Sequence, residues 1–183
     1  RTGILEGNPI HKDMVWAAEK AKLAFIVNVV LDQDKKVIRA FAGHFDQAHR
    51  EGCRFADQLS GVDAAPADIV ISTNGGYPLD QNVYQSVKGM TAAEATCRPG
   101  GVIIMVSSCT DGHGGQELYD TFANEKDKEK IMAGFLATDR DSTIADQWES
   151  QILCRILLKY KVIMVTEAPR EMIEEMQMDY AQD

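Results

Sequence analysis

Apolar and polar positions follow two patterns along the chain, and the pattern changes near residues 60–67. In the first part, a helical pattern precedes two β-rich segments, which the polar DQDKK separates as a turn would, and a second helical pattern follows. Asn before Pro is typical of a helix start, and Gly61 with Pro66 closes the last segment. The predicted elements are a helix from Asn8 to about Leu23, strands at 24–32 and 37–44, and a helix at 45–59.

Beyond residue 66, short apolar strands alternate with helical segments, which is typical of a parallel, layered α/β domain. Eight of the fourteen glycines lie between Gly75 and Gly115, at the ends of the first two strands. Open α/β sheets bind their ligands at these carboxyl ends. The predicted strands lie at 68–73, 99–108 and 161–169, the helices at 81–96, 115–123, 125–137 and 143–160, and a surface helix follows Ala168.

We therefore predict an α/β fold with a layered, mostly parallel sheet flanked by helices, preceded by a partial α+β unit. The boundary separates residues 1–61 from 62–183. The chain opens on Arg1 with RTGILEGNP, which looks like the interior of a longer protein, so we expect the first unit to be the remainder of a domain whose other part is missing. Residues 1–60 should then expose an apolar surface, or a neighbouring chain should cover it.

Composition narrows the classes of partner. The chain has 28 Asp and Glu against 19 Lys and Arg, a net charge of −9, and no basic block, which argues against nucleic acid or an anionic membrane as the main partner. No apolar run reaches the roughly 18 residues of a membrane-spanning helix. The four cysteines are far apart and form no CxxC, which favours a reduced, cytoplasmic setting over a disulfide scaffold.

The segment after the first parallel strand, STNGGYPLDQNVYQSVKGM, carries a candidate binding site. Asp80 is predicted to cap the following helix, on which Tyr84, Gln85 and Lys88 share a face. A phenol, an amide and an ammonium would suit a small carboxylate, and exposed amides of the first helical turn would add positive charge. An amphipathic helix with a solvated polar face explains the same spacing, so the residues alone leave both interpretations open.

The loop after the second parallel strand, SSCTDGHGGQELYD, holds further polar groups. Its hydroxyls and glycine amides would suit an anion at a helix start. Cys109 and His113 invite a metal site or a catalytic pair, but a metal needs three or four ligands and a loop thiol is more often buried. His44 and His49 are expected at the surface. Trp148 extends an apolar helical stripe, for which core packing is the simpler interpretation.

Together, NGGYPLDQNVYQSVKGMTAAE, RTGILEGNP, PGGVIIMVSSCTDGHGG and the helix around Trp148 resemble the nickel-dependent lactate racemase family over essentially the whole chain. The resemblance implies the C-terminal part of a two-domain enzyme that uses a nickel pincer nucleotide, a lysine-tethered mononucleotide that accepts and returns hydride. Gln85 and Lys88 match the Gln and Lys that project into the site from this domain, with Tyr84 beside them. Trp148 matches a tryptophan that approaches from the later helix.

The family's general-base histidines and cofactor-bearing lysine belong to the N-terminal domain. The resemblance therefore implies no metal ligand and no bound cofactor in this chain, which alone would be inactive. The implied partners are a 2-hydroxy acid, with lactate first, and the missing domain, with a possible oligomer through the surface of residues 1–61. The alternative, from another class, is a non-catalytic α/β domain that caps a partner domain and binds a small carboxylate. A Rossmann nucleotide domain is disfavoured because no GxGxxG follows a strand.

Overall fold

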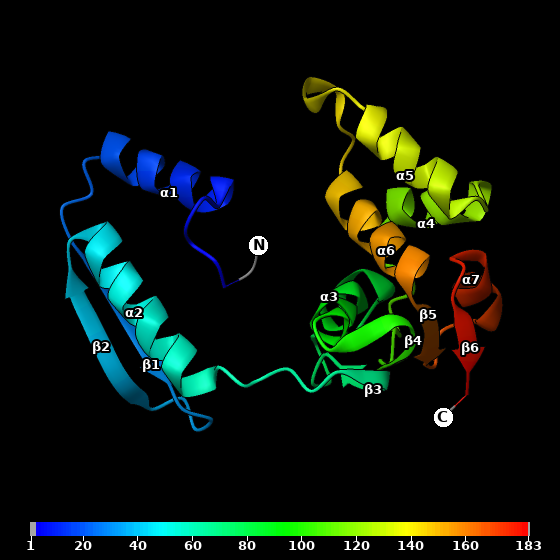
Figure 1. Ribbon diagram of the computed structural model, residues 1–183, viewed down its shortest axis with the longest axis horizontal. Helices are drawn as coiled ribbons and strands as arrows, with labels where there is room; N and C mark the ends of the chain where they lie inside the picture. Colours follow the sequence, from blue (N-terminus) through cyan, green and yellow to red (C-terminus); the bar gives the residue numbers. More distant parts are fainter. Residues whose placement is uncertain (1–2, 183) are drawn as a thin grey trace. The chain divides into compact units, whose positions relative to one another are not determined.

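The computed structural model describes residues 3–182 of the chain, which divides into two compact units between Asp63 and Ala64 (Figure 1). Each unit has a sheet of its own, so residues 1–63 do not extend the sheet of the second unit. Within the described residues, no helix is both long enough and apolar enough to cross a membrane.

The first unit is built from two helices and an antiparallel pair of strands. Asn8 caps the first helix by accepting the N–H of Ile10 at 3.1 Å, which confirms the predicted start. The strands pair from Ile26 opposite Gly43 to Leu31 opposite Val37, and the second helix packs along both of them (Figure 1). The elements are α1 (Pro9–Lys20), β1 (Ile26–Leu31), β2 (Val37–Gly43) and α2 (Phe45–Ser60).

This unit has a thin core. Phe41 and Ala48 are its buried hydrophobic residues among those described, whereas Val27 in β1 is 61% exposed. The predicted apolar surface is therefore present. His49 is half-buried, not at the surface as predicted, because its ring stacks on that of the buried His11 at 5.5 Å.

The second unit confirms the predicted α/β class. Its four strands lie in the order β3-β4-β5-β6, and all neighbouring strands are parallel, as repeated strand–helix–strand connections require. Between β4 and α6 the chain forms two helices, and Arg140–Ser142 is a short 3₁₀ turn. The elements are β3 (Ala67–Thr73), α3 (Val83–Glu94), β4 (Cys97–Val106), α4 (Gln116–Asn124), α5 (Lys128–Ala137), α6 (Gln147–Lys159), β5 (Lys161–Val165), α7 (Arg170–Glu175) and β6 (Asp179–Ala181).

The segment after Ala168 differs from the prediction of one surface helix. Only α7 is helical, and Gln177 then takes a left-handed conformation with φ 65°, which ends the helix. The next residues pair with β5 as the strand β6. Met172 and Ile173 thus lie in the predicted helix, and pairing with β5 fixes the residues that follow it.

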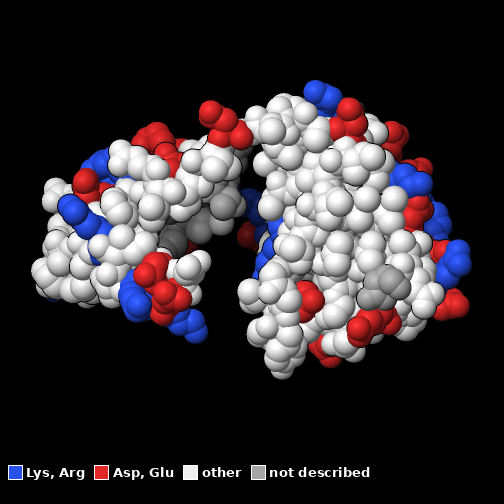
Figure 2. Space-filling model, turned by 90° about the horizontal axis from the view of Figure 1, so that it is seen from below, with Lys and Arg blue, Asp and Glu red and all other residues white. Residues whose placement is uncertain are grey.

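The core of this unit lies on one face of the sheet. Ile103 and Met105 of β4 and Met164 of β5 are fully buried there among the helices. On the opposite face, Ile69 and Ile71 of β3 are 60% and 71% exposed. Figure 2 views this unit on a face whose middle carries few charged side chains, with Lys, Arg, Asp and Glu toward its rim. Parallel sheets usually bury both faces, but among the described residues of this unit only one face of the sheet is covered.

Candidate functional site

Helix α3 begins where the loop after β3 returns to the sheet. Its N-cap is Asn82, whose Oδ1 accepts the N–H of Gln85 at 3.0 Å. The prediction that Asp80 caps the helix is wrong, because Asp80 binds the neighbouring loop: its Oδ2 accepts the N–H of Ser108 at 3.2 Å and its carbonyl accepts the N–H of Cys109 at 2.9 Å. The two loops at the carboxyl edge of the sheet are thereby held together.

The first-turn amides of α3 are not exposed, contrary to the prediction. The N–H groups of Val83 and Tyr84 donate to the carbonyls of Gly112 and His113, both at 3.1 Å. An anion at this helix therefore meets side chains, and the only full positive charge on α3 is that of Lys88.

The buried side of α3 fixes which residues point outward. Val83, Val87 and Met90 are completely buried against the sheet and neighbouring helices. The Ser72 hydroxyl of β3 donates to the Gly89 carbonyl at 2.9 Å, which ties the middle of the helix to the strand. The remaining face carries the polar residues that the sequence singled out.

The structure brings all four predicted site residues together. The Lys88 ammonium donates to Gln85 Oε1 at 2.6 Å and lies 6.0 Å from the centre of the Tyr84 ring. The Tyr84 ring packs edge-to-face with Trp148 of α6, at 6.1 Å between centroids. Its hydroxyl donates to Asp146 Oδ1 at 3.1 Å. One ammonium, one amide and two aromatic rings thus form one cluster from two helices.

Trp148 does not pack in the core, so the simpler interpretation from the sequence is wrong. It is 53% exposed, because α6 buries the neighbouring side made by Leu153 and Ile156. Trp148 also lines a cavity of about 390 Å³ together with Ile152 and Arg155. Its indole ring is accessible to a ligand or a partner domain.

Two acidic residues of this site were missed by the sequence analysis. Asp146 comes just before α6 and holds the Tyr84 hydroxyl; burial and this contact raise the pKa of Tyr84 to about 12, so the phenol stays protonated. Glu149 is 1% exposed, and burial raises its pKa to about 7. The sequence held one signal: Glu149 precedes Leu153 and Ile156 by four and seven positions, which places a charge on the apolar stripe.

The second glycine loop has a structural role. Cys109 is buried, with Sγ 3.4 Å from the hydroxyl oxygens of Ser86 and Ser107. His113 instead accepts the N–H of Gly115 at 3.1 Å, so Cys109 and His113 do not form a pair and that amide is not free for an anion. The hydroxyls of Ser107 and Ser108 donate to the Asp80 carbonyl. Among the described residues, no three His, Cys, Asp or Glu side chains are placed to hold a metal ion.

The fold places the chain among α/β proteins whose parallel sheet carries helices on one face. A solved protein from Thermotoga maritima shares the fold, with a TM-score of 0.67 at 17% identity over 95% of this chain and 47% of that one. The lactate racemase apoprotein from Thermoanaerobacterium thermosaccharolyticum matches far more closely, with a TM-score of 0.94 at 56% identity, covering 100% of this chain and 44% of that one.

Residues 62–183 match the family model of the lactate racemase C-terminal domain, and the chain belongs to the lactate racemase family. The lactate racemase of Thermoanaerobacterium thermosaccharolyticum is 56% identical over 100% of this chain, and that of Lactiplantibacillus plantarum 54% identical over 99%. The chain spans 43% of the length of each of these relatives. The resemblance seen in the sequence is thereby confirmed, and the chain corresponds to the C-terminal part of such a protein.

Proposed function

We propose that this chain supplies the substrate-holding half of an enzyme that interconverts the enantiomers of a 2-hydroxy acid, with lactate as the substrate. The observation that carries the proposal is the cluster of Tyr84, Gln85, Lys88 and Trp148 on α3 and α6. Family membership supports it, since the relatives named above are lactate racemases. Residues 1–61 are, in this proposal, the remainder of the N-terminal domain.

Each side chain has a role that its surroundings permit. The Lys88 ammonium holds the substrate carboxylate, or the oxygen on which negative charge develops as the carbinol carbon is oxidised. Gln85 accepts from Lys88 through Oε1, and its amide N–H groups orient the substrate. The rings of Tyr84 and Trp148 exclude water from the reacting carbon, as hydride chemistry requires.

The cluster fits a nickel pincer nucleotide that lies beside it, but its side chains do not fit a nickel ion bound directly to them. An ammonium, an amide, a phenol and an indole offer no ligand set for nickel, but the two rings suit a flat pyridinium and Lys88 with Gln85 suits an acid beside it. We therefore propose that the missing N-terminal domain carries the nucleotide, which when bound would supply the hydride acceptor and donor for the carbinol carbon of the substrate. In this proposal the isolated chain is inactive. We also propose that the protein is cytoplasmic and that it forms an oligomer through residues 1–61.

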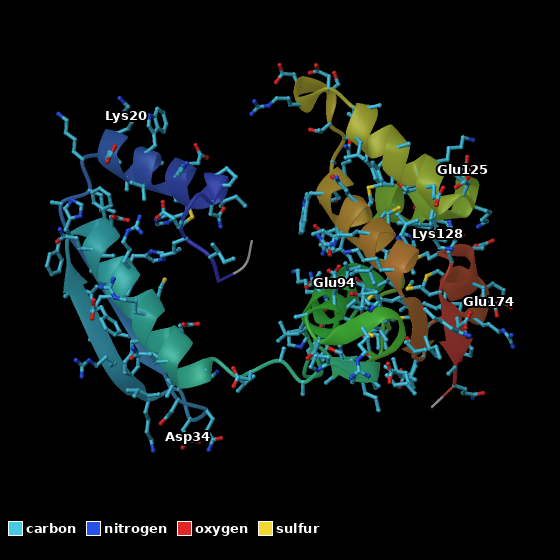
Figure 3. The ribbon with its side chains drawn as sticks, in the orientation of Figure 1. Lys20, Asp34, Glu94, Glu125, Lys128 and Glu174 are labelled. Atoms are coloured by element: carbon cyan, nitrogen blue, oxygen red, sulfur yellow. The ribbon has the colours of Figure 1, made fainter. Side chains whose placement is uncertain are left out.

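Replacement of Lys88 in the full-length enzyme tests the proposal. Lys88→Ala removes a charge-assisted hydrogen bond of about 1.5–3 kcal/mol, so kcat/KM should fall about 10- to 150-fold, as long as cofactor loading is unchanged. Lys128→Ala, on α5 and labelled in Figure 3, is the control and should leave the rate unchanged. Equal rates in the two variants would contradict the catalytic role and favour the interpretation of α3 as an ordinary amphipathic helix with a solvated polar face.

A further inference from the structure

Asp146, the residue immediately before α6, has a backbone conformation that few residues with a side chain adopt. Its φ is 57° and its ψ is 11°, in the left-handed region. This region is unfavourable for residues other than glycine, although Asp and Asn enter it more readily than most. The Asp146 carbonyl begins the helix, because it accepts the N–H groups of Glu149 at 2.9 Å and of Ser150 at 3.2 Å. This backbone role does not require a carboxylate.

The side chain of Asp146 does not cap its own helix. An Asp at the N-cap usually accepts an N–H of the first helical turn, whereas the Asp146 carboxylate makes no such bond. Its Oδ1 accepts the hydroxyl of Tyr84 from α3 at 3.1 Å instead. A left-handed backbone and a helix start without a side-chain cap thus accompany one contact between two helices. Local strain of this kind is common where a residue serves a functional site.

The contact holds a ring that touches the rest of the cluster. Tyr84 packs edge-to-face on Trp148 with 6.1 Å between the ring centroids, and Trp148 comes two positions after Asp146. The Lys88 ammonium lies 6.0 Å from the centre of the same Tyr84 ring. Helices α3 and α6 lie side by side (Figure 1). The start of α6 therefore contacts Tyr84 at two points, its hydroxyl and its ring, and the two contacts together select one rotamer of Tyr84.

We propose that Asp146 is a positioning residue of the candidate site: by accepting the Tyr84 hydroxyl, it fixes the Tyr84 ring against Trp148 and beside Lys88. This inference rests on the proposed function, in which the two rings exclude water from the reacting carbon and Lys88 holds the substrate. Asp146 acts through Tyr84 and needs no contact with the substrate. The phenol donates this bond throughout the working pH range, because burial and the contact with Asp146 raise the pKa of Tyr84 to about 12.

Two substitutions separate the carboxylate from the backbone conformation. Gly adopts left-handed conformations without strain, so Asp146→Gly relieves the backbone and removes the acceptor. Asn tolerates the same conformation and accepts the hydroxyl through its own Oδ1, so Asp146→Asn is the conservative variant. In this chain, nuclear Overhauser contacts between the rings of Tyr84 and Trp148 should be lost in Asp146→Gly and kept in Asp146→Asn. Unchanged contacts in Asp146→Gly would overturn the inference.

Racemisation by the full-length, cofactor-loaded enzyme gives the second test. Asp146→Gly should lower kcat/KM about tenfold, the loss expected for one hydrogen bond, and Asp146→Asn should stay near wild type. Equal losses in the two variants would overturn the inference, because Asn keeps the contact. Tyr84→Phe tests the route of the effect: in that background Asp146→Gly should cause no further loss, and additive losses would show that Asp146 does not act through the Tyr84 hydroxyl.

Glu175→Ala is the matched control, because Glu175 of α7 accepts the hydroxyl of Tyr119 outside the cluster. It also frees a tyrosine hydroxyl from a carboxylate, and it should leave kcat/KM unchanged; a loss equal to that of Asp146→Gly would count against a special role of Asp146. Lys88→Ala separates the two levels of the argument. If it leaves racemisation unchanged, the proposed function fails, and the NMR contacts still decide whether Asp146 holds Tyr84. If Lys88→Ala lowers racemisation and Asp146→Gly does not, only the present inference fails.

Discussion

The two units are built from similarly apolar sequence, but they bury it to very different extents. The second unit has 22 buried hydrophobic residues in one cluster, whereas the first has Phe41 and Ala48 among the described residues. Within residues 3–182, the first unit, about a third of the chain, exposes 13 large hydrophobic side chains, and the second exposes 9. Apolar content therefore does not decide whether a segment forms a core; the number of layers that can cover each strand does.

The difference follows from topology. A two-stranded antiparallel sheet with one helix along it can cover little more than one face, and such hairpins are marginal alone. Four parallel strands joined by helices bury a continuous face and hold α3 and α6 at fixed positions. The candidate site lies on these two helices, so its side chains are placed by the better-packed unit.

Separate expression of the two units is the strongest test of this comparison. Residues 64–183 should unfold cooperatively, because they contain the whole buried cluster. Residues 1–63 should show no cooperative transition, because two buried hydrophobic residues cannot offset the loss of chain entropy. Thermal unfolding followed by circular dichroism measures both. A sharp transition for residues 1–63 would contradict this expectation, because it would show that the first unit folds stably on its own.

The same substitution in each unit gives a smaller, quantitative test. Phe122 of α4 is fully buried, and Phe122→Ala should lower the free energy of unfolding of the second unit by about 3–5 kcal/mol. Phe25, before β1, is 59% exposed, and Phe25→Ala should cost less than about 1 kcal/mol. Urea unfolding of the whole chain measures both variants. Equal losses would mean that Phe25 is buried in solution by a surface that the unit itself does not provide.

The sequence predicted the regular elements well where periodicity was strong. The three central strands and the helix after each loop were found because they are short apolar runs between glycine-rich turns. The two-residue error in the start of α3 has a physical cause: both Asp80 and Asn82 are good caps, and only the hydrogen bonds of Asp80 to the next loop decide between them. Strand β6 was missed because its pairing with β5 is non-local.

The site was predicted in part. Helical spacing placed Tyr84, Gln85 and Lys88 on one face, but it gave no way to see that Trp148 lies against that face, 6.1 Å from Tyr84. Only the resemblance to a family named Trp148 as a site residue. Glu149 escaped because a charged residue is expected at a helix surface, and its burial depends on how α6 packs in the folded unit.

The smallest expected effect compares the asparagine caps of the two units. Asn82→Ala removes the bond to the Gln85 N–H and the bond that Asn82 donates to Asp111 at 3.3 Å, at a buried position, so it should cost about 1–2 kcal/mol. Asn8→Ala removes the cap of α1, which lies in the first unit, and should cost about 0.5 kcal/mol or less in the main transition.

Asn82→Ser is the control for the cap, since the Ser hydroxyl also accepts the N–H of the first helical turn, adds no charge beside Asp111 and should restore part of the loss. Gly114 sharpens this prediction, because a Cβ added there would lie 2.4 Å from the Asn82 side chain. The second glycine loop therefore packs directly on the cap, and Asn82 affects more than its own helix. If Asn8→Ala shifts the main urea transition as much as Asn82→Ala, the two units unfold as one, and the contrast between them holds for packing but not for cooperativity.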